Sequence, residues 1–145
     1  MSPETERAAE AREWLVKAAV DLRGAHIDLD ATPPLLEDAL FHCQQAVEKS
    51  LKAFLVWHDA TFRKTHSLEE LGRRCCELDE TLSRLVDEAV PLTEYAWAFR
   101  YPGAAVVPEE TETHAALRLA VRVAGAIACR LPSEAVPPGI PRQSN

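Results

Sequence analysis

The sequence predicts an all-α protein, folded as an up-and-down helical bundle of four long helices plus one short helix. Apolar residues recur every three or four positions along most of the chain, which is the spacing of amphipathic helices. The alternation of period two that is typical of strands is missing, and the Gly count of 5 leaves few tight turns. With 145 residues, of which 47% are hydrophobic, the chain is large enough to bury a core without disulfides or metal ions.

The first two expected helices are long and amphipathic. The first spans about Glu4 to Leu29, with its small and aliphatic residues on one stripe. Pro33 and Pro34 then force an extended connection, because each removes a backbone donor and restricts the residue before it. The second helix spans about Leu35 to His58. Its polar side carries Gln44, Gln45, Glu48, Lys49 and Lys52, in which positions 48 and 52 have the spacing of a favourable ion pair.

The short third helix is predicted over about Leu68 to Leu78. Ser67 and Glu70 have the spacing of a capping box, in which the Ser67 hydroxyl accepts from the amide of Glu70 and the Glu70 carboxylate reaches back to the amide of Ser67. The fourth helix begins at about residue 79 or 81 and extends to Phe99. Pro91 is expected to kink or break it, because proline lacks the amide hydrogen and collides with the preceding turn.

The last long helix is expected to begin at Pro108, placed at the first helical position and followed by Glu109, Glu110 and Glu112, and to reach about Leu131. Residues 132–145 contain four prolines and no apolar period, so we expect a disordered Pro-rich tail. The predicted organisation is therefore one helical bundle over residues 1–131 and a tail over 132–145. Short connections between long helices make neighbouring helices antiparallel.

Charge and composition exclude several classes of protein. The chain has 16 Lys and Arg against 23 Asp and Glu, a formal net charge of -7, so extended nucleic-acid binding is not expected. Its first residues are charged, and no apolar stretch approaches the ~20 residues that span a bilayer. We therefore expect a cytoplasmic protein without membrane association. The four cysteines are expected to be reduced thiols.

Recognised chemical motifs are missing from the sequence. It has no GxxxxGK[ST] or GxGxxG phosphate loop, no HExxH, no GxSxG and no EF-hand loop. None of the five histidines follows a Glu by three positions, which excludes the ligand pattern of a di-iron bundle. The sequence therefore predicts no catalytic residue, no metal site and no cofactor.

A local excess of positive charge is the main functional signal. Residues 41–74 hold six Lys or Arg side chains against four Asp or Glu. If the fourth helix ends beside the second, Arg100 joins the polar residues of the second helix around one cleft, which suits a phosphate or nucleotide. The alternative interpretation is a solvated helix face whose lysine stems lie along the surface.

Three segments resemble the HEPN domain. They are residues 41–53 (FHCQQAVEKSLKA), residues 64–71 (KTHSLEEL) and residues 100–103 (RYPG), and residues 18–22 (AAVDL) also fit. The resemblance covers about Ala11 to Leu131. It implies an up-and-down helical bundle, usually a homodimer, often encoded beside a minimal nucleotidyltransferase with which it forms a toxin-antitoxin-like pair.

Many HEPN proteins are metal-independent RNases that carry an Arg-x4-6-His motif. In this sequence the corresponding positions after Arg100 hold Ala105, Val106 and Val107, so the imidazole that would serve as general acid or base is missing. The RYP form is similar to the non-catalytic branch of the family, described as nucleotide-binding or as the substrate-binding partner of the nucleotidyltransferase. That resemblance implies a nucleotide- or anion-binding site formed by Gln45, Lys49, Lys52, His66, Arg100 and Tyr101.

The favoured interpretation is a HEPN-type module that binds a nucleotide or phosphate-bearing ligand and works with a nucleotidyltransferase. Two alternatives stay open. One is a metal-independent RNase toxin with a non-standard site, for instance Arg100 with His66. The other is a structural protein whose apolar helix faces serve only homo-oligomerisation.

Overall fold

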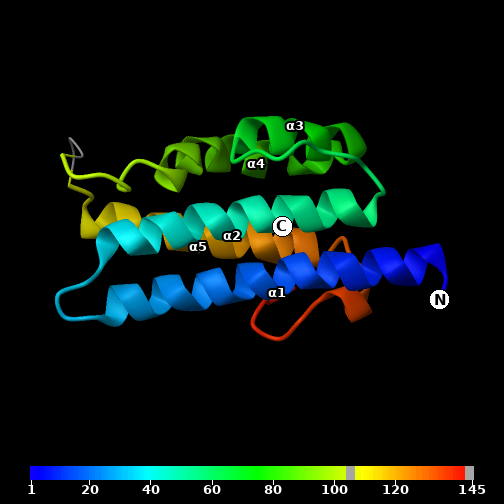
Figure 1. The fold of residues 1–145 in the computed structure, drawn as a ribbon, viewed down its shortest axis with the longest axis horizontal. Coiled ribbons are helices and arrows are strands. Elements are labelled where there is room, and N and C mark those ends of the chain that lie inside the picture. Colours follow the sequence, from blue (N-terminus) through cyan, green and yellow to red (C-terminus); the bar gives the residue numbers. More distant parts are fainter. Residues whose placement is uncertain (104–106, 143–145) are drawn as a thin grey trace.

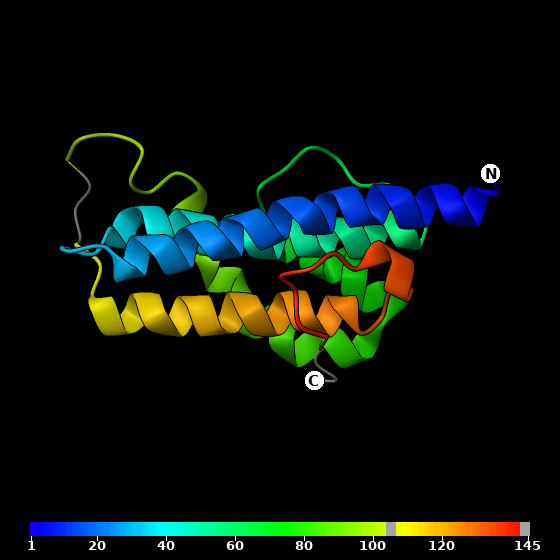
Figure 2. The same cartoon turned by 90° about the horizontal axis from the view of Figure 1, so that it is seen from below.

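Three long helices form the framework of the molecule (Figure 1). They are α1 (Pro3–Asp30), α2 (Leu36–Trp57) and α5 (Glu110–Ala128), and α1 and α2 lie antiparallel along most of their length. The second view shows α5 on the side of this pair opposite the 58–67 loop (Figure 2). The structure is a computed structural model and describes residues 1–103 and 107–142. The all-helical bundle predicted from the sequence is confirmed for these residues.

Small residues on α1 allow α2 to approach closely. The buried apolar stripe of α1 consists largely of alanines, and leucines occupy the positions between them. The N-terminus of α1 is stabilised by capping, because the Ser2 hydroxyl accepts a hydrogen bond from the amide of Thr5 at 3.1 Å and Pro3 occupies the first turn. The buried residues of α1 that face the core include Ala8, Ala11, Leu15, Ala18, Leu22 and Ala25.

A layer of short helices covers the other side of α2 (Figure 1). It consists of α3 (Leu68–Leu78), the 3-10 turn η1 (Glu80–Leu82), α4 (Ser83–Ala89) and the 3-10 segment η2 (Val90–Ala96). The predicted long fourth helix is therefore replaced by a short α-helix and 3-10 segments. The break at Pro91 was predicted and is confirmed, because α4 ends two residues before the proline.

The capping box at α3 forms only in part. The Ser67 hydroxyl accepts from the amide of Glu70 at 3.1 Å, as predicted. The Glu70 carboxylate instead accepts from Nε of Arg63 at 2.6 Å, and the amide of Ser67 donates to the Thr65 hydroxyl at 3.0 Å. Arg63 takes the carboxylate because a charged donor is a stronger partner than a backbone amide.

The start of α5 and the tail differ from the sequence prediction. Pro108 lies one position before the N-cap residue Glu109, and not at the first helical position. The described part of the tail, residues 132–142, includes the 3-10 turn η3 (Ser133–Ala135) and lies between α1 and α5 (Figure 2). Ala135 and Ile140 are buried, and Arg12 of α1 donates to the carbonyl of Val136 at 3.1 Å. These apolar and hydrogen-bonded contacts order a segment for which the sequence predicts disorder.

Among residues 1–103 and 107–142, no helix is both long and apolar enough to cross a membrane.

Candidate functional site

Glu48 lies at the centre of a buried polar network on α2. Its side chain accepts from Nζ of Lys52 at 3.0 Å and from Nε2 of Gln44 at 3.2 Å, and it lies 2.8 Å from Nδ1 of His66. Burial acts to raise the pKa of Glu48, but the hydrogen bonds from His66, Lys52 and Gln44 outweigh it and hold the pKa below its ordinary value. The predicted ion pair between Glu48 and Lys52 is confirmed.

This polar side of α2 is buried because aromatic residues from two other segments cover it. Nζ of Lys52 lies 5.2 Å from the ring centroid of Trp14 in α1 and 5.9 Å from that of Phe62 in the 58–67 loop. The two rings meet edge to face with centroids 6.5 Å apart. Glu48 is only 3% exposed. The interpretation of this side as a solvated helix face therefore does not hold for Glu48 and Lys52, whose charges are paired within the protein.

A second polar cluster joins α1 to α2. The Asp21 carboxylate is buried, with Oδ2 2.6 Å from Nζ of Lys49 and Oδ1 2.8 Å from Nδ1 of His42. Lys49 is therefore directed toward α1 and has its charge balanced there. Lys49 and Lys52 lie on the same helix, but they point to different neighbours.

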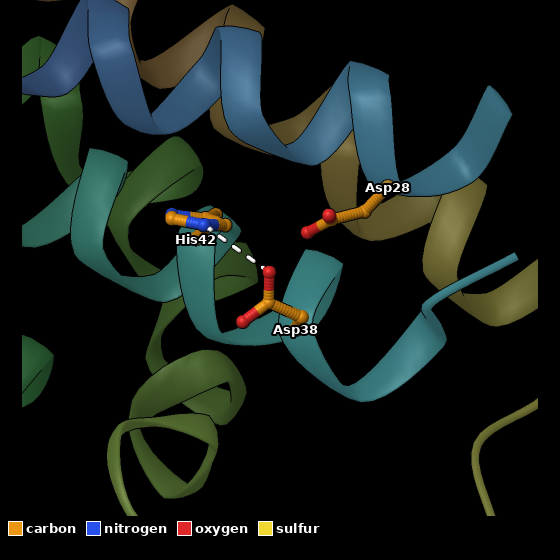
Figure 3. Close-up of side chains that lie close together, drawn as sticks. All are labelled: Asp28, Asp38 and His42. Carbon is orange, nitrogen blue, oxygen red and sulfur yellow. Dashed lines mark ion pairs between the residues drawn. The ribbon is translucent and has the colours of Figure 1, made fainter. Parts of the chain in front are cut away.

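Next to Asp21, two further side chains, Asp28 and Asp38, converge with His42 where α1 ends and α2 begins (Figure 3). Asp28 of α1 faces Asp38 and His42 of α2, and Nε2 of His42 lies 3.4 Å from Oδ2 of Asp38. One ligand atom from each of the three lies within 4.8 Å of the others. Burial, together with the neighbouring Asp38 carboxylate, raises the pKa of Asp28 to about 6.

A pocket of about 300 Å³ lies at the same end of the bundle, beside Arg100. The ring of Tyr95 stacks on that of Phe99 with centroids 5.8 Å apart, and its hydroxyl donates to Glu112 at 2.7 Å. Trp97 remains 52% exposed. The pocket is lined by Glu37, Asp38, Phe41, Tyr95, Ala96, Trp97, Phe99 and Arg100.

The structure places the six residues predicted for nucleotide binding at three locations. Gln45, Lys52 and His66 belong to the network around Glu48, in which Gln45 donates to the Gln44 side chain at 2.6 Å. Lys49 pairs with Asp21. Arg100 lines the 300 Å³ pocket, and Tyr101 is exposed in the segment that follows.

The Arg100 pocket and the Glu48 network lie apart because they contact different parts of α2. Phe41 borders the pocket and Lys52 belongs to the network, and the two residues are about 16 Å apart along the helix axis. The η2 segment brings Arg100 to the beginning of α2, and not to its centre. Of the positions expected to hold a catalytic His, Ala105 and Val106 lie outside the described residues, and Val107 is exposed.

Sequence reasoning missed the cluster of Asp28, Asp38 and His42. Two signals could have pointed to it. Asp21 and Asp28 are seven residues apart and share a face with the buried alanines of α1, which is an unusual place for carboxylates. Asp38 and His42 are four residues apart, so they occupy one face of α2.

These features define a small helical-bundle domain with paired buried charges and a polar cluster where its first two long helices meet. The family model for the HEPN domain matches residues 11–129. The chain therefore belongs to the HEPN domain family, which agrees with the resemblance found in the sequence. Neither the curated proteins nor the solved structures include a match to it.

Proposed function

We propose that this HEPN-domain protein binds a nucleotide in the pocket beside Arg100 and acts with a minimal nucleotidyltransferase in a toxin-antitoxin-like pair. One observation carries the proposal: an arginine, an exposed tryptophan, three partly buried aromatic rings and two carboxylates line one concave site of about 300 Å³. That volume is at the lower end of small-molecule pockets, and it suits a nucleobase better than a whole nucleotide.

The chemistry of the lining residues matches the parts of a nucleotide. Arg100 offers the planar fork that binds phosphate. The rings of Phe41 and Trp97 provide surfaces on which a base can stack. Glu37 and Asp38 accept hydrogen bonds from exocyclic amino groups and repel phosphate. The base is therefore proposed to face the carboxylates while the phosphates stay at Arg100.

The other predicted site residues are assigned supporting roles. Lys49 and Lys52 each pair with a carboxylate within the protein, so their charges are already engaged. The His66 ring faces the Glu48 carboxylate. Gln45 extends the same hydrogen-bond network. We propose that these four residues hold α2 in place, whereas Arg100 and the adjacent exposed Tyr101 contact the ligand.

Calorimetric titration with ATP, GTP, CTP and UTP tests nucleotide binding. The wild-type protein is expected to show saturable heat with at least one of them, and Arg100→Ala is expected to weaken binding at least tenfold, as the loss of a charge-assisted contact predicts. Arg122→Ala is the matched control, because Arg122 pairs with Glu88 at the surface outside the pocket. Absence of saturable heat with all four nucleotides at millimolar concentration contradicts the proposal.

The partnership is tested separately by the neighbouring reading frame. A short nucleotidyltransferase encoded there should co-purify with the tagged full chain after co-expression. If the neighbouring frame encodes another kind of protein, or if its nucleotidyltransferase does not co-purify, this part of the proposal is contradicted. Nucleotide binding is then judged from the calorimetric titration alone.

The RNase alternative has one supporting observation of its own. The His66 side chain is 59% exposed, and Glu48 orients its ring through Nδ1 at 2.8 Å. A carboxylate-oriented imidazole open to solvent is a possible general base. Cleavage of labelled RNA in the presence of EDTA, abolished by His66→Ala, would favour this alternative, and the absence of cleavage at micromolar protein excludes it.

Homodimerisation is proposed through the apolar face of α1. Val16, Val20 and Ile27 are exposed along it and border a groove of about 700 Å³ against the tail. Arg23 and Asp30 flank this groove seven residues apart. A second copy packed antiparallel across a twofold axis would pair these opposite charges, so the face suits self-association. Sedimentation should show a dimer for the wild type and a monomer for Val20→Asp; a monomeric wild type contradicts the proposal.

A further inference from the structure

Asp28, Asp38 and His42 form a side-chain cluster for which the proposed nucleotide pocket does not account, although Asp38 borders both. We propose that this cluster binds a divalent first-row transition-metal ion such as Zn²⁺ or Mn²⁺. The proposal does not depend on nucleotide binding, because it concerns the metal ion alone.

The first observation is the state of the Asp28 side chain. Asp28 is only 7% exposed, and its buried Oδ2 atom has no hydrogen-bond partner among the described residues. Figure 3 shows its carboxylate directed toward Asp38 and His42. A buried carboxylate oxygen without a partner is costly, and such atoms in folded proteins are normally satisfied by another polar atom, a water molecule or an ion.

The second observation is the orientation of His42. Its Nδ1 atom lies 2.8 Å from the Asp21 carboxylate, which accepts hydrogen bonds, so Nδ1 is the donor. In the neutral ring this leaves the lone pair on Nε2, the atom that faces Asp38 at 3.4 Å. Histidines that bind metal ions are commonly oriented by a carboxylate on the opposite ring nitrogen in this way.

The third observation is the space that Gly24 leaves at the same nitrogen. A Cβ atom on Gly24 would lie 3.0 Å from Nε2 of His42 and 3.1 Å from Cδ2. Any other residue at position 24 would therefore press on the face of the imidazole ring and displace it. Glycine inside a helix is unfavourable, and here the missing side chain makes room for the imidazole.

The balance of charge indicates which kind of ligand is missing. Lys49 lies 2.6 Å from Asp21 and balances it. Neither Asp28 nor Asp38 has a Lys or Arg partner in the described part of the chain. A dication would balance both carboxylates, and two oxygen atoms with one imidazole nitrogen form a donor set typical of transition metals. Ca²⁺ prefers six to eight oxygen ligands, so it fits this set less well.

The geometry requires only small side-chain movements to close around an ion. The three ligand atoms lie within 4.8 Å of one another, whereas ligands sit about 2.0 to 2.2 Å from a bound zinc ion. Asp38 supplies the movement and the route of entry, because its side chain is 57% exposed. Three protein ligands leave at least one coordination position open for water or another ligand.

Calorimetry of the metal-free full chain with ZnCl₂ alone and with MnCl₂ alone tests the site. We expect one ion per chain, with affinity at least tenfold weaker in Asp38→Asn and in His42→Ala. His114→Ala is the matched control, because His114 faces Glu110 at 3.8 Å on the surface with the same four-residue spacing. The control should bind the ion as the wild type does.

Thermal unfolding of Asp28→Asn provides a second test that does not depend on a fragile variant. Without metal, this variant should melt at the same temperature as the wild type or higher, because it removes an unpartnered buried charge. Added Zn²⁺ should raise the melting temperature of the wild type by about 3 °C or more and leave that of Asp28→Asn unchanged. The proposal is overturned if the wild type shows no saturable binding at about 100 µM metal, or if Asp28→Asn and Asp38→Asn bind as tightly as the wild type.

Discussion

Oδ1 of Asp21 in α1 lies 2.8 Å from Nδ1 of His42 in α2. The second oxygen of the same carboxylate lies 2.6 Å from Nζ of Lys49, which is two helical turns further along α2. One buried side chain of α1 therefore contacts two positions of α2. The relative register of the two longest helices is fixed by these polar contacts as well as by the packing of small residues.

We predict that Asp21→Asn destabilises the protein by about 2 to 4 kcal/mol, because it leaves the partly buried Lys49 without its anionic partner. Urea unfolding monitored by circular dichroism measures the change. In the double variant Asp21→Asn/Lys49→Met no uncompensated lysine remains, so part of the lost stability should return. Equal unfolding midpoints for Asp21→Asn and the wild type would show that this contact does not stabilise the native state.

Glu48 should make the protein sensitive to acid. Its pKa in the folded state is held below the ordinary value near 4.5 by hydrogen bonds from His66, Lys52 and Gln44, which outweigh the effect of burial. A depressed carboxyl pKa contributes stability above the unfolded pKa, and this contribution is lost as the pH falls through the folded pKa. The free energy of unfolding should therefore drop below about pH 4.5.

Glu48→Gln is the variant that isolates this effect. It should be less stable than the wild type at pH 6, because the amide cannot balance Lys52, and the difference between the two should shrink as the pH falls toward 3. Urea midpoints at several pH values measure it. A difference that stays constant across this range would assign the acid response to other carboxylates.

The helices could be predicted from the sequence because their periodicity is local. The apolar stripes of α1 and α2, the Ser67 cap and the break at Pro91 all depend on residues within a few positions of one another. The tail could not be predicted in this way. Ala135 and Ile140 are buried because the tail packs against segments distant in the sequence, and no local pattern records such packing.

The candidate site shows the same limit. The Glu48–Lys52 pair follows from i,i+4 spacing, but its burial depends on Trp14 and Phe62, which come from segments distant in the sequence. The expected cleft required Arg100 to reach the middle of α2. Arg100 instead lines a pocket with Glu37, Asp38 and Phe41 at the beginning of α2, and no local sequence pattern records this tertiary placement.

Gly72 is predicted to be intolerant of any side chain. A Cβ on Gly72 of α3 would collide with a methyl group of Val86 in α4. Gly72→Ala should therefore destabilise the protein by about 1 to 3 kcal/mol, although alanine is the better helix former. The denaturant midpoint measures the loss. Adding Val86→Ala should make the double variant more stable than the sum of the two single effects, whereas simple additivity would mean that the two residues do not collide.

The last prediction concerns the tail, which composition predicts to be disordered and the structure places between α1 and α5. Ile140 is buried there, so Ile140→Ala should cost about 2 kcal/mol, at the low end for a buried isoleucine because the tail packs only at the edge of the core. Arg12→Ala should also lower stability and should expose the tail to proteolysis, since the guanidinium donates to the carbonyl of Val136. Glu134→Ala is the control, because this side chain is exposed and should leave unfolding unchanged. If Ile140→Ala unfolds like the wild type and the tail is cleaved equally fast in all variants, the tail does not pack on α1 in solution.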